Sequence, residues 1–121
     1  MDYKFDNERP IYIQLVELIR VEIISGKLSI GERIPSVREL SLKLRVNPNT
    51  LQKALQELEN DGLIYTERTN GKFVTDNIKL IEKAKEELAK VKVNKYLMDM
   101  QNIGITKEEA INYLKELGGD K

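Results

Sequence analysis

Apolar residues recur along the first half of the chain at spacings that predict three helices and a hairpin. Residues 10–25 place apolar side chains on one helical face, and residues 37–44 and 48–61 repeat that spacing. The two short helices are separated by a three-residue turn, Arg45-Val46-Asn47, which is typical of a helix-turn-helix. The expected order from residue 10 is therefore one helix and then a helix-turn-helix.

A β-hairpin follows in the predicted order. Residues 63–68 and 72–75 are β-prone and flank Thr69-Asn70-Gly71, and an Asn-Gly pair between such runs is a strong hairpin signal. A hairpin directly after a helix-turn-helix is the arrangement of a winged helix. The sequence therefore predicts a mainly α fold, an α+β winged helix-turn-helix with a C-terminal two-helix dimerisation extension.

Local signals fix where the predicted helices begin. Ser36 with Glu39 three residues later forms a capping box, and Thr106 with Glu109 forms a second one. Asn47 is a good cap and is followed by Pro48, which favours the first helical position.

The C-terminal third has the composition of long helices. Residues 78–102 contain no Pro or Gly, and a final helix is expected over 107–117. Ile81, Ala84, Leu88 and Val91 are spaced by three, four and three residues, a heptad-like seam that predicts packing on another helix. We divide the chain into a winged helix-turn-helix domain, residues 1–76, and a helical dimerisation tail, residues 77–121.

Composition excludes most enzymes. The 121 residues include no Cys, His or Trp, so thiolate nucleophiles, Cys/His zinc sites and Ser-His-Asp triads are impossible, and no cofactor or metal is expected. Neither a signal pattern nor a long apolar run occurs, so the expected location is the cytoplasm. The net charge of zero hides a local imbalance, because residues 33–53 hold five basic side chains and one acid, a net charge of +4.

The basic segment coincides with the end of the second helix-turn-helix helix that enters the DNA major groove in such motifs. Asn49 and Gln52 carry amides that can pair with adenine, while Arg38 and Arg45 can bind guanine or phosphate. A basic stretch is also often just a solvated surface. Ser36 and Glu39 are more readily explained as capping residues, and Asn70-Gly71 is first a turn requirement. The coincidence of these features in one topological order favours DNA binding.

Residues 10–75 resemble the GntR family of bacterial transcription regulators. The resemblance rests on Pro10-Ile11-Tyr12 with Gln14, on residues 31–40 (GERIPSVREL), on Val46-Asn47-Pro48-Asn49-Thr50 and on Gly62-Leu63-Ile64. It implies a homodimer on a roughly palindromic operator of double-stranded DNA. It also implies contacts from Arg38, from the start of the second short helix and from the wing. The wing departs from the family's usual run, because its basic residue has moved out of the turn to Lys72.

Residue chemistry and the resemblance together give the candidate sites. The candidate DNA contacts are Arg33, Ser36, Arg38, Arg45, Pro48, Asn49, Thr50, Gln52, Lys53, Arg68, Asn70, Gly71 and Lys72. The candidate dimerisation residues are Ile81, Ala84, Leu88, Val91, Leu97, Ile111 and Leu114.

The tail refines the resemblance. With 46 residues after the wing, the chain is too short to enclose a large effector cavity and is similar to the short-tailed YtrA-like subfamily. That resemblance implies control of a transporter operon, for which the residues themselves give no evidence. An unknown small-molecule effector is a further candidate partner, and no residue identifies it. The alternative is a winged helix that acts as a protein–protein interaction module, which a random-oligonucleotide selection would distinguish.

Overall fold

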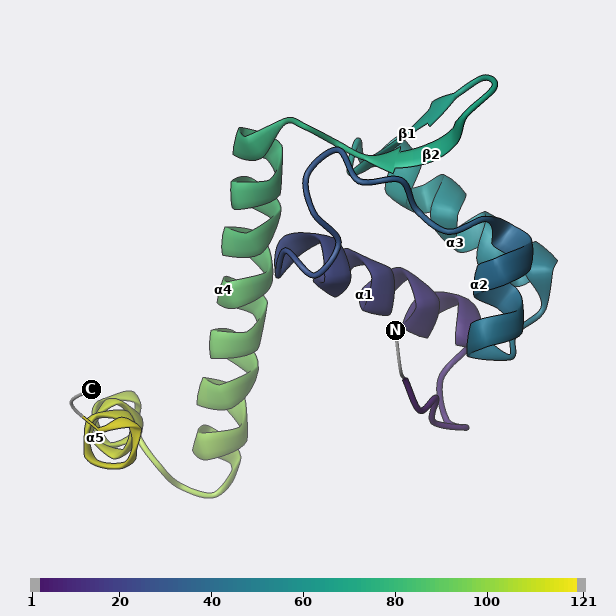
Figure 1. Ribbon diagram of the computed structural model, residues 1–121. Helices are drawn as coiled ribbons and strands as arrows, with labels where there is room; N and C mark the ends of the chain where they lie inside the picture. The colour runs from purple at the N-terminus through teal and green to yellow at the C-terminus, as the bar shows by residue number, and fades with distance from the viewer. Residues whose placement is uncertain (1–2, 120–121) are drawn as a thin grey trace. The chain divides into compact units, whose positions relative to one another are not determined.

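The computed structural model describes residues 3–119, so the first two residues of the predicted winged-helix domain and the last two of the predicted tail lie outside it (Figure 1). Five helices and two strands follow one another in the described residues. They are α1 (Ile11–Ile24), α2 (Val37–Leu44), α3 (Pro48–Asn60), β1 (Ile64–Glu67), β2 (Gly71–Val74), α4 (Ile78–Asn102) and α5 (Lys107–Gly118). This order confirms the predicted mainly helical winged helix-turn-helix.

The helices begin where the capping signals place them. Ser36 and Glu39 form the predicted reciprocal capping box at α2, and the Asn47 side chain accepts a hydrogen bond from the Asn49 N–H at the start of α3. Pro10 is a small exception, because it precedes α1 as its N-cap rather than being its first helical residue.

Contacts divide the chain into two compact units, residues 1–84 and 85–121, which are described separately. The core of the first unit forms where α1 packs on α3. Leu15 and Ile19 of α1 and Leu51, Leu55 and Leu58 of α3 are at most 1% exposed. Apolar faces at helical spacing thus meet in one interior, as the sequence pattern requires.

The wing is a two-stranded antiparallel hairpin that gains a third segment. β1 and β2 pair from Ile64 opposite Val74 to Glu67 opposite Gly71. Residues 31–34 then run along the free edge of β2, where the Ile34 N–H donates to the Lys72 carbonyl at 2.8 Å. These residues therefore add a third extended segment to the two-stranded sheet.

The start of α4 belongs to the first unit. Ile81 is 9% exposed and belongs to the hydrophobic core, and Ala84 packs against that core. These two residues were predicted to mediate dimerisation as half of a seam. The structure instead places them against the winged-helix core of their own chain. That part of the apolar face of α4 is therefore already covered.

The second unit is held together by few contacts. α5 begins with the predicted capping box of Thr106 and Glu109. The Tyr96 hydroxyl of α4 donates to the Ala110 carbonyl of α5 at 2.6 Å, and Ala110 is fully buried. A hydrogen bond and one small buried side chain therefore join the two helices, and much of their apolar surface stays uncovered.

Candidate nucleic-acid interface

The N-terminal end of α3 presents a polar face to solvent. Its buried stripe leaves Pro48, Asn49, Gln52 and Lys53 exposed and Thr50 half-buried. Gln52 and Lys53 lie three and four residues after Asn49, so both are on the side of the helix that carries Asn49. The positive end of the helix dipole adds to the attraction of this end for phosphate. The structure thus gathers the predicted recognition residues on one surface.

Two arginines flank this surface from α2 and the turn. Arg38 and Arg45 are exposed, and neither forms an ion pair within residues 3–119. Arg45 ends α2 in the left-handed conformation with φ 57°, which turns the chain toward α3. Both guanidinium groups are therefore free to bind phosphate or a guanine edge.

Ser36 is the N-cap residue of α2. Its hydroxyl oxygen accepts the Glu39 N–H at 3.1 Å, while the Glu39 carboxylate accepts the Ser36 N–H at 3.4 Å. Since the hydroxyl hydrogen is not used in that cap, the group can still donate to a phosphate, and its DNA contact stays a prediction.

The tip of the wing is exposed and internally braced. Asn70 donates from its side-chain amide to the Glu67 carboxylate at 3.0 Å, and Gly71 has φ +103°, a conformation that favours glycine. The Arg33 Nε donates to the Asn70 carbonyl at 2.7 Å. Arg68 lies exposed in the turn between the strands. The structure therefore brings Arg33, predicted as part of the basic segment, to the wing rather than to α3.

Lys72 is less available than the sequence indicates. Its ammonium group lies 2.9 Å from Glu59 Oε1 and 3.0 Å from the Thr66 hydroxyl, and its side chain is 23% exposed. The hydrogen bond from Lys72, with a second from Thr66, holds the pKa of Glu59 below its ordinary value. This contact ties the wing to α3, so a DNA contact by Lys72 has to compete with it.

Glu59 is a site residue that the sequence reasoning missed. It lies near the end of α3, among the acidic residues that follow the basic segment in the sequence. The hairpin register was the one available signal for this residue. It places Thr66 opposite Lys72, so two side-chain donors lie together and favour a nearby carboxylate acceptor.

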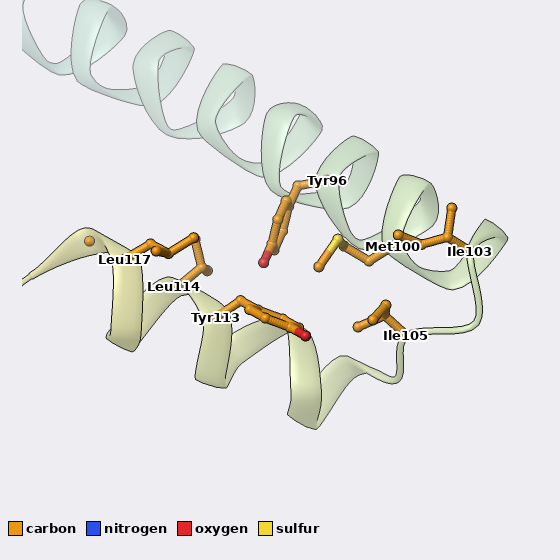
Figure 2. Close-up of a pocket in the computed structure, with 8 residues that line it drawn as sticks. Tyr96, Met100, Ile103, Ile105, Tyr113, Leu114 and Leu117 are labelled. Atoms are coloured by element: carbon orange, nitrogen blue, oxygen red, sulfur yellow. The ribbon is translucent and has the colours of Figure 1, made fainter.

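The remaining candidate dimerisation residues lie in the second unit or at its start. Leu88 and Leu97 are half-buried, while Val91 is 62%, Ile111 39% and Leu114 54% exposed. α4 and α5 form an open apolar groove of about 330 Å³, in which Tyr96 and Met100 project toward Tyr113 and Leu114 (Figure 2). Ile103 and Leu117 at its margins are 72% and 81% exposed. The groove residues Tyr113 and Leu117 were not among the predicted contacts.

No helix within residues 3–119 is both long and apolar enough to cross a bilayer. The same residues contain no cluster of acidic side chains that could hold a metal ion.

Residues 11–74 match the family of bacterial regulatory proteins described as the gntR family. The chain is similar to the HTH-type transcriptional repressor YtrA of Bacillus subtilis, with 34% identity across 92% of this chain and 86% of that protein. A solved GntR family transcriptional regulator from Listeria monocytogenes is 41% identical, with a TM-score of 0.87 over 93% of this chain and 99% of the other. These relatives are transcription regulators and not enzymes, in agreement with the prediction.

A third similarity includes DNA. The DNA-binding domain of AraR, solved in complex with operator ORX1, is 30% identical, with a TM-score of 0.53 over 62% of this chain and 92% of that chain. The matched part has the size of the winged-helix unit, so a fold of this kind is known to bind an operator.

Proposed function

Since the chain belongs to the GntR family of bacterial regulatory proteins, a family of DNA-binding transcription regulators, we propose that it is a repressor that binds a palindromic operator as a homodimer. The observation that carries the proposal is the exposed polar start of α3, flanked by two arginines without ion-pair partners in the described chain. Repression is supported by the similarity to the repressor YtrA. Control of a transporter operon remains what the resemblance implies.

The reading of bases is assigned to α3. Asn49 and Gln52 pair with base edges, Thr50 contacts phosphate or a thymine methyl group, and Lys53 contacts phosphate. Pro48 contributes an apolar surface, since it has no polar side chain. Arg38, Arg45 and Ser36 position α3 on the backbone, while Arg68 and the Asn70-Gly71 tip approach the DNA beside it.

The proposed dimer forms through the tail. Leu88, Val91, Leu97, Ile111 and Leu114, with the groove margin at Leu117, offer apolar surface that water would otherwise cover. Burial of such surface between two copies is favourable by about 25 cal/mol per Å². A dimer would hold two α3 helices roughly one DNA turn apart, about 34 Å, and so require a palindromic site.

Selection from random double-stranded oligonucleotides tests the function. The expected result is an enriched inverted repeat, bound by a protein whose mass in light scattering is that of a dimer. Because phosphate contacts release counterions, affinity for that site should fall steeply between low and moderate salt. A selection that enriches no sequence would favour a protein–protein interaction module instead.

A matched pair of variants localises the reading surface. Asn49→Ala with Gln52→Ala removes both amides, and we expect the affinity gap between the selected site and random DNA to shrink by about ten-fold or more. Gln56→Ala, an exposed amide one turn farther along α3, is the control. Equal losses in the two variants would remove the N-terminal end of α3 from the reading role.

A further inference from the structure

The segment before α2 carries an arginine toward the tip of the wing. Residues 31–34 are hydrogen-bonded along β2, and Arg33 lies directly opposite Phe73. Side chains two residues apart on a strand share a face, so Gly71 is on the face of Phe73 and within the diagonal reach of Arg33. The pairing therefore directs a long side chain from the body of the domain along β2.

The guanidinium group rests against the backbone of the tip. Its Nε donates to the Asn70 carbonyl at 2.7 Å. A Cβ atom at Gly71 would lie 3.3 Å from that Nε, which is closer than most Cβ contacts, and 3.4 Å from Nη2. Gly71 thus serves two needs, since its φ of +103° favours glycine and its missing side chain leaves room for Arg33.

No carboxylate competes for this arginine within residues 3–119, since Arg33 forms none of the ion pairs of the described chain. The hydrogen bond to Asn70 is consequently its one polar side-chain contact there. A bond between a charged donor and a backbone carbonyl is among the stronger protein hydrogen bonds. It joins the exposed tip to a segment that leads directly into α2.

We propose that Arg33 is a positioning residue for DNA binding, which clamps the Asn70-Gly71 tip so that the wing meets DNA in one conformation. This assignment rests on the proposed DNA-binding function and changes the role of Arg33 within it. The residue acts on affinity through the wing and not through a phosphate contact of its own. The pre-ordered tip spares the entropy cost of fixing a loop on binding.

Two substitutions separate the hydrogen bond from the charge. In Arg33→Gln, the side-chain nitrogen is separated from Cα by the same number of bonds as Arg Nε, so a neutral donor remains near the Asn70 carbonyl. In Arg33→Lys, the charge remains but a carbon occupies the Nε position. Arg33→Ala removes both. A clamp requires the donor, whereas a phosphate contact requires the charge.

The first measurement uses the whole 121-residue chain without DNA. The Asn70 carbonyl and the Gly71 N–H belong to one peptide group, so the Gly71 amide resonance reports on the bond to Arg33. We expect Arg33→Ala and Arg33→Lys to shift that resonance and to quicken exchange of the Asn70 amide by about ten-fold, while Arg33→Gln retains most of the protection. Lys43→Ala, which removes an exposed cation from α2, should leave both signals unchanged. Unaltered wing signals in Arg33→Ala would overturn the clamp.

The second measurement is affinity for the selected operator. Arg33→Ala and Arg33→Lys should each weaken binding by about five- to ten-fold, and Arg33→Gln by much less. The reverse order, with lysine restoring affinity and glutamine failing, would show a direct phosphate contact and overturn the positioning role. If the unaltered protein selects no operator, the proposed function fails, while the exchange experiment still decides whether Arg33 holds the wing.

Discussion

The winged-helix unit and the tail bury their apolar residues to very different degrees. Residues 3–84 enclose a continuous core in which Leu15, Leu51 and Leu55 are fully buried. In residues 85–119 the one buried side chain is Ala110, while Leu114 and Leu117 are more than half exposed. The first unit thus has the interior of an independent domain, whereas the second leaves large apolar side chains exposed to solvent. A single helix, α4, contributes to both.

The largest expected effect separates the two ends of that helix. Ile81→Ala should lower the free energy of unfolding of the winged-helix unit by about 2–4 kcal/mol, because it leaves a cavity in the core. Val91→Ala is the matched control from the same heptad-like seam. Since Val91 is 62% exposed and lies outside the winged-helix unit, that variant should change the unit's free energy of unfolding by less than about 0.5 kcal/mol. Urea unfolding followed by circular dichroism measures both, and equal losses would erase the distinction between the units.

The next test addresses the open surface of the tail. The double variant Leu114→Asp with Leu117→Asp should raise the dimer dissociation constant by about 30-fold or more, because two charges would enter an apolar contact. Asn112→Asp adds a negative charge to the same helix outside the groove and should have little effect. Sedimentation equilibrium measures the dissociation constants. A double variant that remains as dimeric as the parent would assign the interface elsewhere.

A third prediction concerns DNA affinity and a substitution on the surface of the winged-helix unit. Arg38→Ala should weaken operator binding by about 1–3 kcal/mol, since an exposed guanidinium with no ion-pair partner in the described chain is lost. The free energy of unfolding of this variant should stay within about 0.5 kcal/mol of that of the parent protein. Gel-shift titration against the selected operator gives the affinity, and an unchanged value would remove Arg38 from the contacts.

The smallest expected effect lies in the tie between the wing and α3. Glu59 has a pKa below its ordinary value of 4.5, chiefly because Lys72 donates to it, so its ionised form is stabilised in the folded state. That stabilisation is complete above about pH 4.5 and is lost as the pH falls through the lower folded-state pKa. Glu59→Gln should cost about 1 kcal/mol at pH 7 and flatten the acid side of the stability profile. Thermal unfolding between pH 3 and 7 would reveal an unchanged profile if the pair contributes nothing.

Much of the fold was predictable because the signals at which helices begin are local. The Ser36 and Thr106 capping boxes and the Asn47-Pro48 start act within a few residues. The surface at the start of α3 followed for the same reason, since a buried stripe leaves its other face to solvent. Partners across the chain were not predictable in this way. Glu59 and Lys72 are adjacent only because the hairpin folds back on α3.

The amino-acid sequence by itself determined the order of the elements, their ends and the family, because periodicity, capping and motif spacing are properties of neighbouring residues. Tertiary structure decided which surface or partner each apolar or charged side chain contacts. It assigned Ile81 to the core of its own chain and left Val91 exposed, although both belong to one seam. It also brought Arg33 to the wing tip and Lys72 to Glu59. The physical reason is common to these cases: periodicity shows which side chains can be buried or paired, and only long-range packing selects the surface or partner that they meet.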